Sequence, residues 1–397
     1  MNNFLLLILS FIFVLEFFIY ITVKLFKKNN WILTKKKKFP EFKKNKIFNF
    51  FFKSYHPLLG WDKKPGRIGY DNTDKKKIIY KIEKNGSRSY IKKFKKTKII
   101  TYGDSYAFCR NVNDNETWQY FLSKKTQSKV LNFGVGNYGI DQSLLKYKIT
   151  KNLGINKIII FAFVPETICR VQSQWKNFLE FGNIFGFKPA FSLKGDKLIL
   201  KKNYITDRKS FNKIKKIIKK LSKEDRFYSE KFEKNLFQFP YIFNFFRHFS
   251  FNLKFFFTLY LTIFANKKIK QKIIDYQFSL IMKKNLSYSH NLYLENYSQK
   301  LLEKLLSSIY KLGKKRKHKI IFINLPQLFD LKLKSHVMYK KFYKRMNESY
   351  NIIDFTEIFK KYNYSKLYDN DVYGGHLSNF GNKIVAKELL KYLKKNN

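Results

Sequence analysis

The sequence predicts a three-layer α/β fold, in which a parallel sheet of about five strands is covered by helices on both faces. Five short segments are largely apolar, as buried strands are, and lie at 98–102, 129–135, 157–164, 319–325 and 351–355. Segments with helical periodicity alternate with them. Unbroken apolar strands that alternate with helices are typical of parallel sheets whose two faces are both buried.

The helices are expected between these strands and after the last of them. Asn115 is a suitable cap for the first helix, whose apolar face would carry Trp118, Phe121 and Leu122. Three further segments have the same periodicity, at about 142–153, 296–313 and 382–394. The alternation of strands and helices therefore starts near residue 96.

Residues at about 170–290 interrupt this alternation with helical, aromatic stretches such as 239–264. A second transmembrane span is not expected there, because Arg247, His248 and Lys254 fall within the stretch. We favour an amphipathic helical insertion, which would either cap the active site or lie on a membrane surface.

Residues 4–23 form an apolar segment of about the 20 residues that a helix needs to cross a bilayer. Glu16 lies within it and must find a partner or bind a proton there. A cleaved signal peptide is the alternative, but it needs a basic start and a small-residue cleavage site. Met1, Asn2 and Asn3 carry no basic side chain and no such site follows. We therefore favour a retained, single-pass membrane anchor.

These observations divide the chain into an anchor at 1–27, a linker and lead-in with short strands at 28–95, and a domain at 96–397 that contains the insertion. Within the lead-in, Asn85-Gly86 is a hairpin signal. The lysines after the apolar segment would place the body in the cytoplasm under the positive-inside rule. Lysine is frequent in every segment, however, so the side of the membrane stays open.

The composition is strongly basic, with 81 Lys and Arg against 28 Asp and Glu and a net charge of +53. We do not expect specific nucleic-acid binding, because the lysines are spread along the chain and form no single stripe. Lys, Asn, Ile, Phe and Tyr, all with A/T-rich codons, are over-used together, so base composition explains the charge. The charge would still favour anionic surfaces, such as lipid head groups or acidic glycans.

Neither a metal site nor a cofactor is expected. The six His residues form no ligand cluster, and the spacing of Cys109 and Cys169 is not that of a metal site. The two cysteines would allow one disulfide if the chain were outside the cytoplasm.

Three short motifs carry chemically useful residues. Ser105, in TYGDSYAF, directly follows the first long strand, where ligands of open parallel sheets bind. The segment VLNFGVGNYGIDQ follows the next strand, and its small residues, such as Gly136, let the backbone approach a ligand. His376, in GGHLSNFGN, precedes the last helix, where an imidazole can act as a general base. Taken alone, the Gly-Asp-Ser motif is better explained as a turn and His376 as a surface residue, and a glycine loop needed only for packing is common.

In this order and spacing, the three motifs resemble the SGNH/GDSL hydrolase family. The resemblance covers about residues 98–394 and implies a flavodoxin-like arrangement of the sheet. It implies Ser105 as nucleophile and His376 as its base. The backbone N–H groups of Ser105 and of Asn137, at the family's Gly position, would hold the oxyanion. Asn tolerates the left-handed backbone better than other non-Gly residues.

The sequence departs from the family pattern at two positions. Glu166 stands where the family has an oxyanion-hole Asn, so its carboxylate must be protonated, turned away or paired. Arg170, four residues on, is the natural partner. The family's D-x-x-H spacing would place the acid at Tyr373, which cannot serve.

Asp371 is the nearest carboxylate to His376 along the chain, and Asp369 is next. Either could hold the imidazole in the required tautomer. We assign Asp371 as the third catalytic residue. The alternative is that both carboxylates cap a turn, with Ser105 and His376 acting as a dyad.

The resemblance implies an enzyme that cleaves esters through an acyl-Ser105 intermediate. Its substrate would be an ester-bearing small molecule, glycan or lipid, and we expect it in a bacterial inner membrane, anchored in the bilayer through residues 4–23. Two alternatives stay open on the same fold: an O-acyltransferase, and a non-catalytic, membrane-tethered binding module. A charge-driven nucleic-acid binder is the third alternative, and it would bind with a steep dependence on salt.

Overall fold

The structure is a computed structural model that describes residues 2–29, 31–72, 77–180, 182–369 and 375–396. The chain divides into two compact units. The sheet unit comprises residues 49–172, 189–203 and 282–397, and the helical unit comprises residues 1–48, 173–188 and 204–281. Residues 49–95, part of the expected lead-in, thus belong to the same unit as the sheet.

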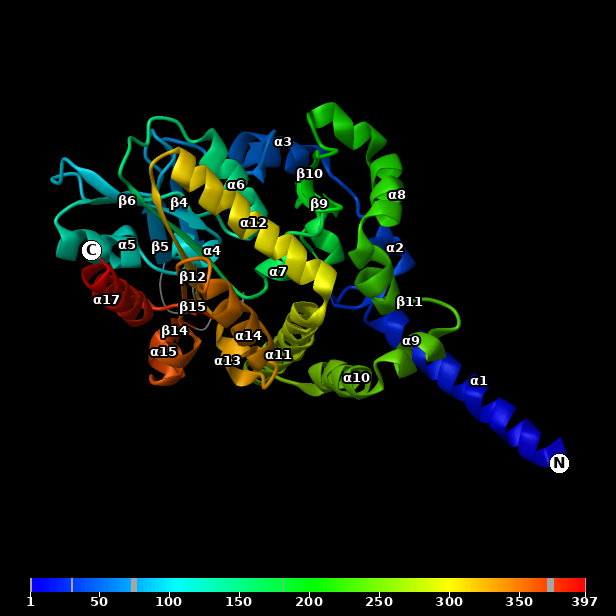
Figure 1. The fold of residues 1–397 in the computed structure, drawn as a ribbon. Helices are drawn as coiled ribbons and strands as arrows, with labels where there is room; N and C mark the ends of the chain where they lie inside the picture. Colours follow the sequence, from blue (N-terminus) through cyan, green and yellow to red (C-terminus); the bar gives the residue numbers. More distant parts are fainter. Residues whose placement is uncertain (1, 30, 73–76, 181, 370–374, 397) are drawn as a thin grey trace. The chain divides into compact units, whose positions relative to one another are not determined.

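The sheet unit contains a five-stranded, wholly parallel sheet, which confirms the predicted fold class (Figure 1). The strand order is β13-β12-β8-β6-β7. The strands match the five predicted segments, with β6 one residue longer at each end: β6 (Thr97–Gly103), β7 (Lys129–Asn132), β8 (Ile158–Phe163), β12 (Lys319–Asn324) and β13 (Ile352–Asp354). The central strands are apolar at consecutive positions. Consecutive side chains point to opposite faces of the sheet, and neither face meets water.

Helices cover both faces of this sheet. On one face, α5 (Trp118–Thr126) and α17 (Asn379–Lys395) share an apolar cluster with Ile160 and Ile321 of the strands. On the other face, Tyr147 of α6 (Ile140–Ile149) packs its ring edge-on against Phe161, at 5.6 Å between centroids. The long helix α12 (Asn296–Lys315) lies against α6.

The start of α5 corrects one prediction. Thr117 is its N-cap, and the Thr117 hydroxyl accepts a hydrogen bond from the backbone N–H of Tyr120. Asn115 lies inside a preceding turn of 3-10 helix, Asp114–Glu116, which Asn113 caps through a reciprocal pair of bonds with Glu116. The predicted cap at Asn115 is therefore wrong by two residues, because a second, tighter helical turn precedes the α-helix.

The lead-in packs against the loops at the carboxyl end of the sheet and forms hydrogen bonds with them. Its strands are β2 (Tyr55–His56), β3 (Gly60–Trp61), β4 (Ile68–Asn72) and β5 (Lys77–Lys81), and Asn85-Gly86 forms a tight turn beyond them. Arg88 is buried beneath the chain after the first sheet strand. Its guanidinium donates to the carbonyl oxygens of Phe108, Cys109 and Val112 and to the carboxylate of Asp114.

The sheet unit is completed by short elements around these layers. They are α4 (Ser105–Phe108), α7 (Thr167–Arg170), the hairpin β9 (Ala190–Lys194) and β10 (Lys197–Lys201), α13 (Leu328–Lys332), α14 (His336–Asn347), α15 (Thr356–Lys360), α16 (Tyr364–Leu367), β14 (Tyr368–Asp369) and β15 (His376–Leu377). The hairpin β9–β10 falls within the expected insertion at 170–290 but belongs to the sheet unit.

The helical unit begins with α1 (Asn2–Leu25) and includes α8 (Ile214–Glu224), α9 (Tyr241–Arg247) and α10 (Phe249–Phe264). Shorter elements are α2 (Lys35–Lys38) and the parallel pair β1 (Leu33–Thr34) and β11 (Leu236–Phe237). The helices α3 (Lys44–Lys53) and α11 (Lys267–Asn291) run from one unit into the other. Within the described ranges, α1 is the one helix long and apolar enough to cross a membrane, a test that a signal sequence would also pass.

Gly103, the last residue of β6, gives a test of the packing at the sheet edge. Its φ is +148°, and a Cβ atom there would lie 1.8 Å from the carbonyl oxygen of Ala162. Gly103→Ala should therefore lower the free energy of unfolding by about 3 kcal/mol or more. Gly136 is the matched control, since a Cβ there would meet nothing within 4 Å. The free energies of unfolding are measured by denaturant unfolding. Equal values for the Gly103 and Gly136 variants would contradict the close packing at Gly103.

Candidate active site

Ser105 lies at the carboxyl edge of the sheet, directly after β6. It is the first residue of α4, and its side chain is buried, with 7% of its surface exposed. Asp104, which precedes it, is the N-cap of this short helix. The turn therefore presents the Ser105 hydroxyl at the end of the sheet where ligands of parallel α/β folds bind.

The Asp104 carboxylate fixes this turn to the neighbouring strand. One oxygen accepts from the N–H of Tyr106 at 2.8 Å, and the other accepts from the N–H of Val164 at 2.9 Å, just beyond β8. Burial raises the pKa of the Asp104 carboxyl, while the nearby Arg170 guanidinium opposes that rise. The Asp of the Gly-Asp-Ser motif thus has a positioning role that the sequence interpretation did not recognise.

His376 meets Ser105 across 271 residues of sequence. Its Nε2 atom lies 2.8 Å from the Ser105 Oγ, and the imidazole is itself buried. His376 lies on the short strand β15, just before α17, whose N-cap Ser378 accepts a hydrogen bond from the N–H of Gly381. The structure therefore brings together the two residues that the sequence predicted as nucleophile and base.

The loop that carries His376 is held by Tyr106. The Tyr106 hydroxyl donates to the Gly375 carbonyl oxygen at 2.7 Å, and its ring lies 5.1 Å from the imidazole. Tyr106 follows the nucleophile directly, so the same turn positions both members of the pair. Its place in the Gly-Asp-Ser-Tyr motif was the available sequence signal, but its partner could not be predicted.

Asn382 is a second positioning residue that the sequence interpretation missed. Its side-chain amide donates to the carbonyl oxygens of Leu377 and Ser378, at 3.2 and 2.9 Å. Its side-chain oxygen accepts from the N–H of Trp118 at 3.2 Å. Asn382 thereby ties the segment after His376 to the start of α5.

The predicted acid, Asp371, and the family's acid position, Tyr373, lie outside the described residues. Asp369 is described, and it lies directly opposite His376 in the antiparallel pair β14–β15. Directly opposed residues of an antiparallel pair have their side chains on the same face of the ribbon. Asp369 is thus beside His376, while the assignment of Asp371 stays a prediction.

The Gly-containing loop after β7 is tightly built. Asn132 accepts from the N–H of Gly134 at 2.9 Å, and Asn137 has a left-handed φ of +69°. The Trp61 indole donates to the Gly136 carbonyl oxygen at 3.1 Å, so the lead-in holds this loop from outside. Within the described part of the chain, no acceptor is found for the backbone N–H of Ser105 or Asn137.

Glu166 and Arg170 form a buried ion pair beside this loop. The Arg170 guanidinium donates twice to the Glu166 carboxylate, at 2.5 and 3.1 Å, and also to the Tyr138 carbonyl oxygen at 3.3 Å. It lies 3.6 Å from the Asp104 carboxylate as well. Of the three states considered for Glu166, the structure shows the paired one, so its charge is balanced by Arg170.

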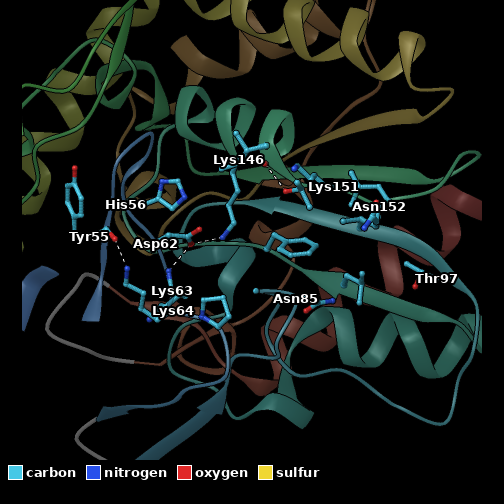
Figure 2. Close-up of a pocket in the computed structure, with 18 residues that line it drawn as sticks. Tyr55, His56, Asp62, Lys63, Lys64, Asn85, Thr97, Lys146, Lys151 and Asn152 are labelled. Atoms are coloured by element: carbon cyan, nitrogen blue, oxygen red, sulfur yellow. Dashed lines mark hydrogen bonds and ion pairs between the residues drawn. The ribbon is translucent and has the colours of Figure 1, made fainter. Parts of the chain in front are cut away.

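A separate cavity of about 650 Å³ lies elsewhere in the sheet unit (Figure 2). Neither Ser105 nor His376 lines it. Two of its lysines already have acceptors: Lys146 donates to the Asp62 carboxylate at 2.6 Å, and Lys64 donates to the Tyr55 carbonyl oxygen at 2.7 Å. This lysine-lined cavity is therefore distinct from the Ser–His pair.

The two cysteines lie apart from the Ser–His pair as buried thiols. Cys109 and Cys169 are buried free thiols, so they do not form the disulfide that the sequence allowed. Burial raises the pKa of the Cys109 thiol to about 12, which makes it a poor nucleophile. In the described ranges, no group of three His, Cys, Asp or Glu side chains is placed to hold a metal ion.

Comparisons with known proteins give only distant similarity. No family model and no curated protein sequence matches the chain. One similar solved structure, from Desulfitobacterium hafniense DCB-2, is assigned to the lipolytic G-D-S-L family; it has 10% identity and a TM-score of 0.32 over 74% of this chain and 98% of its own. Another of that family, from Veillonella parvula DSM 2008, has 9% identity and a TM-score of 0.36 over 74% and 97%.

Because this likeness is weak, the chemistry has to be judged from the side chains themselves. The chain is an α/β protein with a buried Ser–His pair at the carboxyl edge of its parallel sheet. The neighbouring Glu166–Arg170 pair distinguishes this site from the Asn-containing pattern that its motifs otherwise resemble.

Arg170 offers a test of this electrostatic arrangement. Arg170→Gln should lower the free energy of unfolding by about 3–5 kcal/mol, because it leaves Glu166 and Asp104 as buried carboxylates without their cation. The double variant Glu166→Gln/Arg170→Gln should recover part of the loss. Lys391→Gln, which breaks a surface pair with Glu388, is the control and should cost less than about 1 kcal/mol. Equal losses for Arg170→Gln and the control, measured by denaturant unfolding, would contradict the arrangement.

Proposed function

We propose that this protein is a membrane-anchored serine hydrolase that cleaves ester bonds through an acyl-Ser105 intermediate. The observation that carries the proposal is the 2.8 Å separation between the Ser105 Oγ and the His376 Nε2. A hydroxyl at hydrogen-bond distance from an imidazole is the arrangement that activates a serine nucleophile. The order of the three motifs along the chain supports the same chemistry.

The first half of the reaction forms the acyl-enzyme. His376 Nε2 takes the proton from the Ser105 hydroxyl as Oγ attacks the ester carbonyl carbon. The carbonyl oxygen becomes an oxyanion, which the backbone N–H groups of Ser105 and Asn137 are proposed to hold. The bond to the leaving alcohol then breaks, and the imidazolium of His376 returns the proton to that alcohol.

The second half releases the acyl group. His376 takes a proton from water, the resulting hydroxide attacks the acyl carbon, and the bond to Ser105 breaks with return of the proton to Oγ. In an O-acyltransferase, a sugar hydroxyl would replace the water, and the same two residues would serve. Product analysis with and without an added alcohol separates these two outcomes.

Glu166 takes the place of one donor in the proposed oxyanion hole. A carboxylate cannot donate a hydrogen bond, so stabilisation would fall to the two backbone N–H groups. Arg170 already neutralises this carboxylate, which limits its repulsion of a developing oxyanion. This pairing supports activity at a site that would otherwise favour a non-catalytic binding module.

The proposed membrane anchor is α1, and it bears on the substrate. An enzyme held at a membrane with a net charge of +53 would meet acyl groups on anionic lipids or envelope glycans. We therefore propose lipid or glycan esters as the substrate class.

Fluorophosphonate labelling tests the nucleophile. The wild-type chain should be labelled, and Ser105→Ala should not, because the reagent bonds to an activated serine oxygen. His376→Asn should slow labelling by about 1000-fold or more, since the general base is lost. Ser123→Ala, which removes another buried serine, is the matched control and should be labelled normally. Labelling of Ser105→Ala at the wild-type rate would overturn the assignment.

A second comparison tests the acid. Asp371→Asn should lower kcat for hydrolysis of a p-nitrophenyl ester by about 10⁴, because the imidazole loses the group that fixes its tautomer. Asp369→Asn is the matched control and should lower kcat by less than about tenfold. The opposite result would transfer the role to Asp369. Small effects in both variants would show that Ser105 and His376 act as a dyad.

A further inference from the structure

The helical unit exposes an unusual amount of apolar surface around α9 and α10. Seven large side chains there have between 50% and 87% of their surface exposed, and they are Phe239, Phe243, Phe246, Leu253, Phe257, Ile263 and Phe264. Scattered apolar residues are normal on a protein surface, but many large exposed apolar side chains on two packed helices indicate an interaction site.

The same helices also bury the end of α1. Ile19 and Val23 of α1 lie in one apolar cluster with Phe245, Phe255 and Phe256 of α9 and α10. The end of α1 is therefore a packed part of the helical unit, which favours a retained anchor over a cleaved signal peptide.

Polar contacts join the same elements. The Thr22 hydroxyl is 2.7 Å from the Tyr260 hydroxyl, and Phe18 stacks on the Tyr260 ring at 6.0 Å between centroids. Tyr260 of α10 thus contacts two successive turns of α1. Any environment that surrounds this stretch of α1 also surrounds α10.

Glu16 needs a partner because it lies in an apolar segment, and it finds one at the start of α9. Its two carboxylate oxygens accept from the backbone N–H groups of Tyr241 and Ile242, at 2.6 and 2.7 Å. These are the first two N–H groups of α9, which no residue of α9 itself can satisfy. The negative charge also lies at the positive end of the helix dipole.

The other end of α9 is satisfied in a similar way. The side-chain amide of Asn252 donates to the carbonyl oxygens of Asn244 and Phe245, at 3.0 and 2.8 Å. Inside a lipid phase, backbone polar groups must be satisfied by the protein because no water is available. Side chains within the unit thus satisfy two of these backbone groups at each end of α9.

The length of α1 determines how deep in a bilayer Glu16 and the helices that contact it would lie. Residues 4–15, before Glu16, would span only about 18 Å at 1.5 Å per residue, against a hydrocarbon thickness of about 30 Å. The full apolar segment, residues 4–23, would span about 30 Å. A membrane-spanning α1 must therefore include the stretch that carries α9 and α10, and Glu16 would lie about 10 Å inside the nearer boundary.

We propose that α9 and α10 are embedded in the hydrocarbon of one bilayer leaflet beside α1, so that lipid acyl chains cover their exposed apolar side chains. This inference rests on the proposed membrane anchorage of α1 and goes beyond it, since α1 could anchor the chain with α9 and α10 in water.

The exposed basic residues near this surface fit the head-group region. Arg247 and Lys254 have long side chains that can reach the interface from a shallow helix. Lys267, Lys268 and Lys270 follow at the start of α11, all exposed. Anionic head groups would attract such residues.

Depth-dependent quenching tests the proposal on the full chain in vesicles of phosphatidylcholine and phosphatidylglycerol. A fluorescent label is placed at Phe243→Cys or Phe257→Cys, with Phe11→Cys on α1 and the exposed Lys216→Cys on α8 as controls. Labels at 243 and 257 should be quenched at least threefold more by spin-labelled acyl chains than by an aqueous nickel chelate. The label at 216 should show the reverse.

The controls separate the outcomes. If the label at 11 is quenched from the acyl chains and those at 243 and 257 only from water, the embedding of α9 and α10 is overturned and the anchor stands. If all four are quenched from water, the anchor fails as well. Fluorophosphonate labelling of Ser105 is an independent measurement, so neither result decides the catalytic proposal.

A second measurement needs no substitution in the packed segment. Lipids that carry a diazirine in the acyl chain are photolysed with the wild-type chain in the same vesicles. Carbene adducts should appear on peptides that cover residues 239–264 and be at least tenfold rarer on those that cover 214–224. Adducts in equal, background amounts on both would overturn the proposal even if the cysteine variants failed to fold.

Discussion

The carboxylate of Asp104 is the contact on which the site depends. Parallel strands bring their carboxyl ends to one edge of the sheet, but this alone does not fix the loops that follow them. Asp104 fixes one loop by accepting from Tyr106 in its own turn and from Val164 beyond β8. Tyr106 then holds the loop of His376 through Gly375. A short chain of hydrogen bonds thus links the nucleophile turn to both the sheet and the base.

Arg170 extends this network to the region where the reaction would build negative charge. Its guanidinium lies between Glu166 and Asp104, two buried carboxylates that would repel each other without it. The same residue donates to the Tyr138 carbonyl oxygen, next to Asn137 of the proposed oxyanion hole. The departure from the family pattern at Glu166 is therefore compensated within the protein, by a cation placed one helical turn away.

The helical unit compensates the charge of Glu16 in a comparable way. Glu16 would be costly in an apolar segment, and the free N–H groups of α9 would be costly in lipid. Each removes the cost of the other, since the carboxylate accepts from Tyr241 and Ile242. A residue that interrupts the apolar segment thus joins α1 to the rest of its unit.

The sequence by itself determined the five strands, the main helices and the pairing of Ser105 with His376, because these follow from apolar periodicity and from short motifs in a fixed order. It misplaced the cap of α5 at Asn115, since a turn of 3-10 helix shifts the cap without changing the apolar pattern. Only the tertiary structure decided that Tyr106 holds the His376 loop and that Glu16 caps α9. Their partners lie more than 200 residues away, and no local pattern encodes which distant backbone group will be left without a partner.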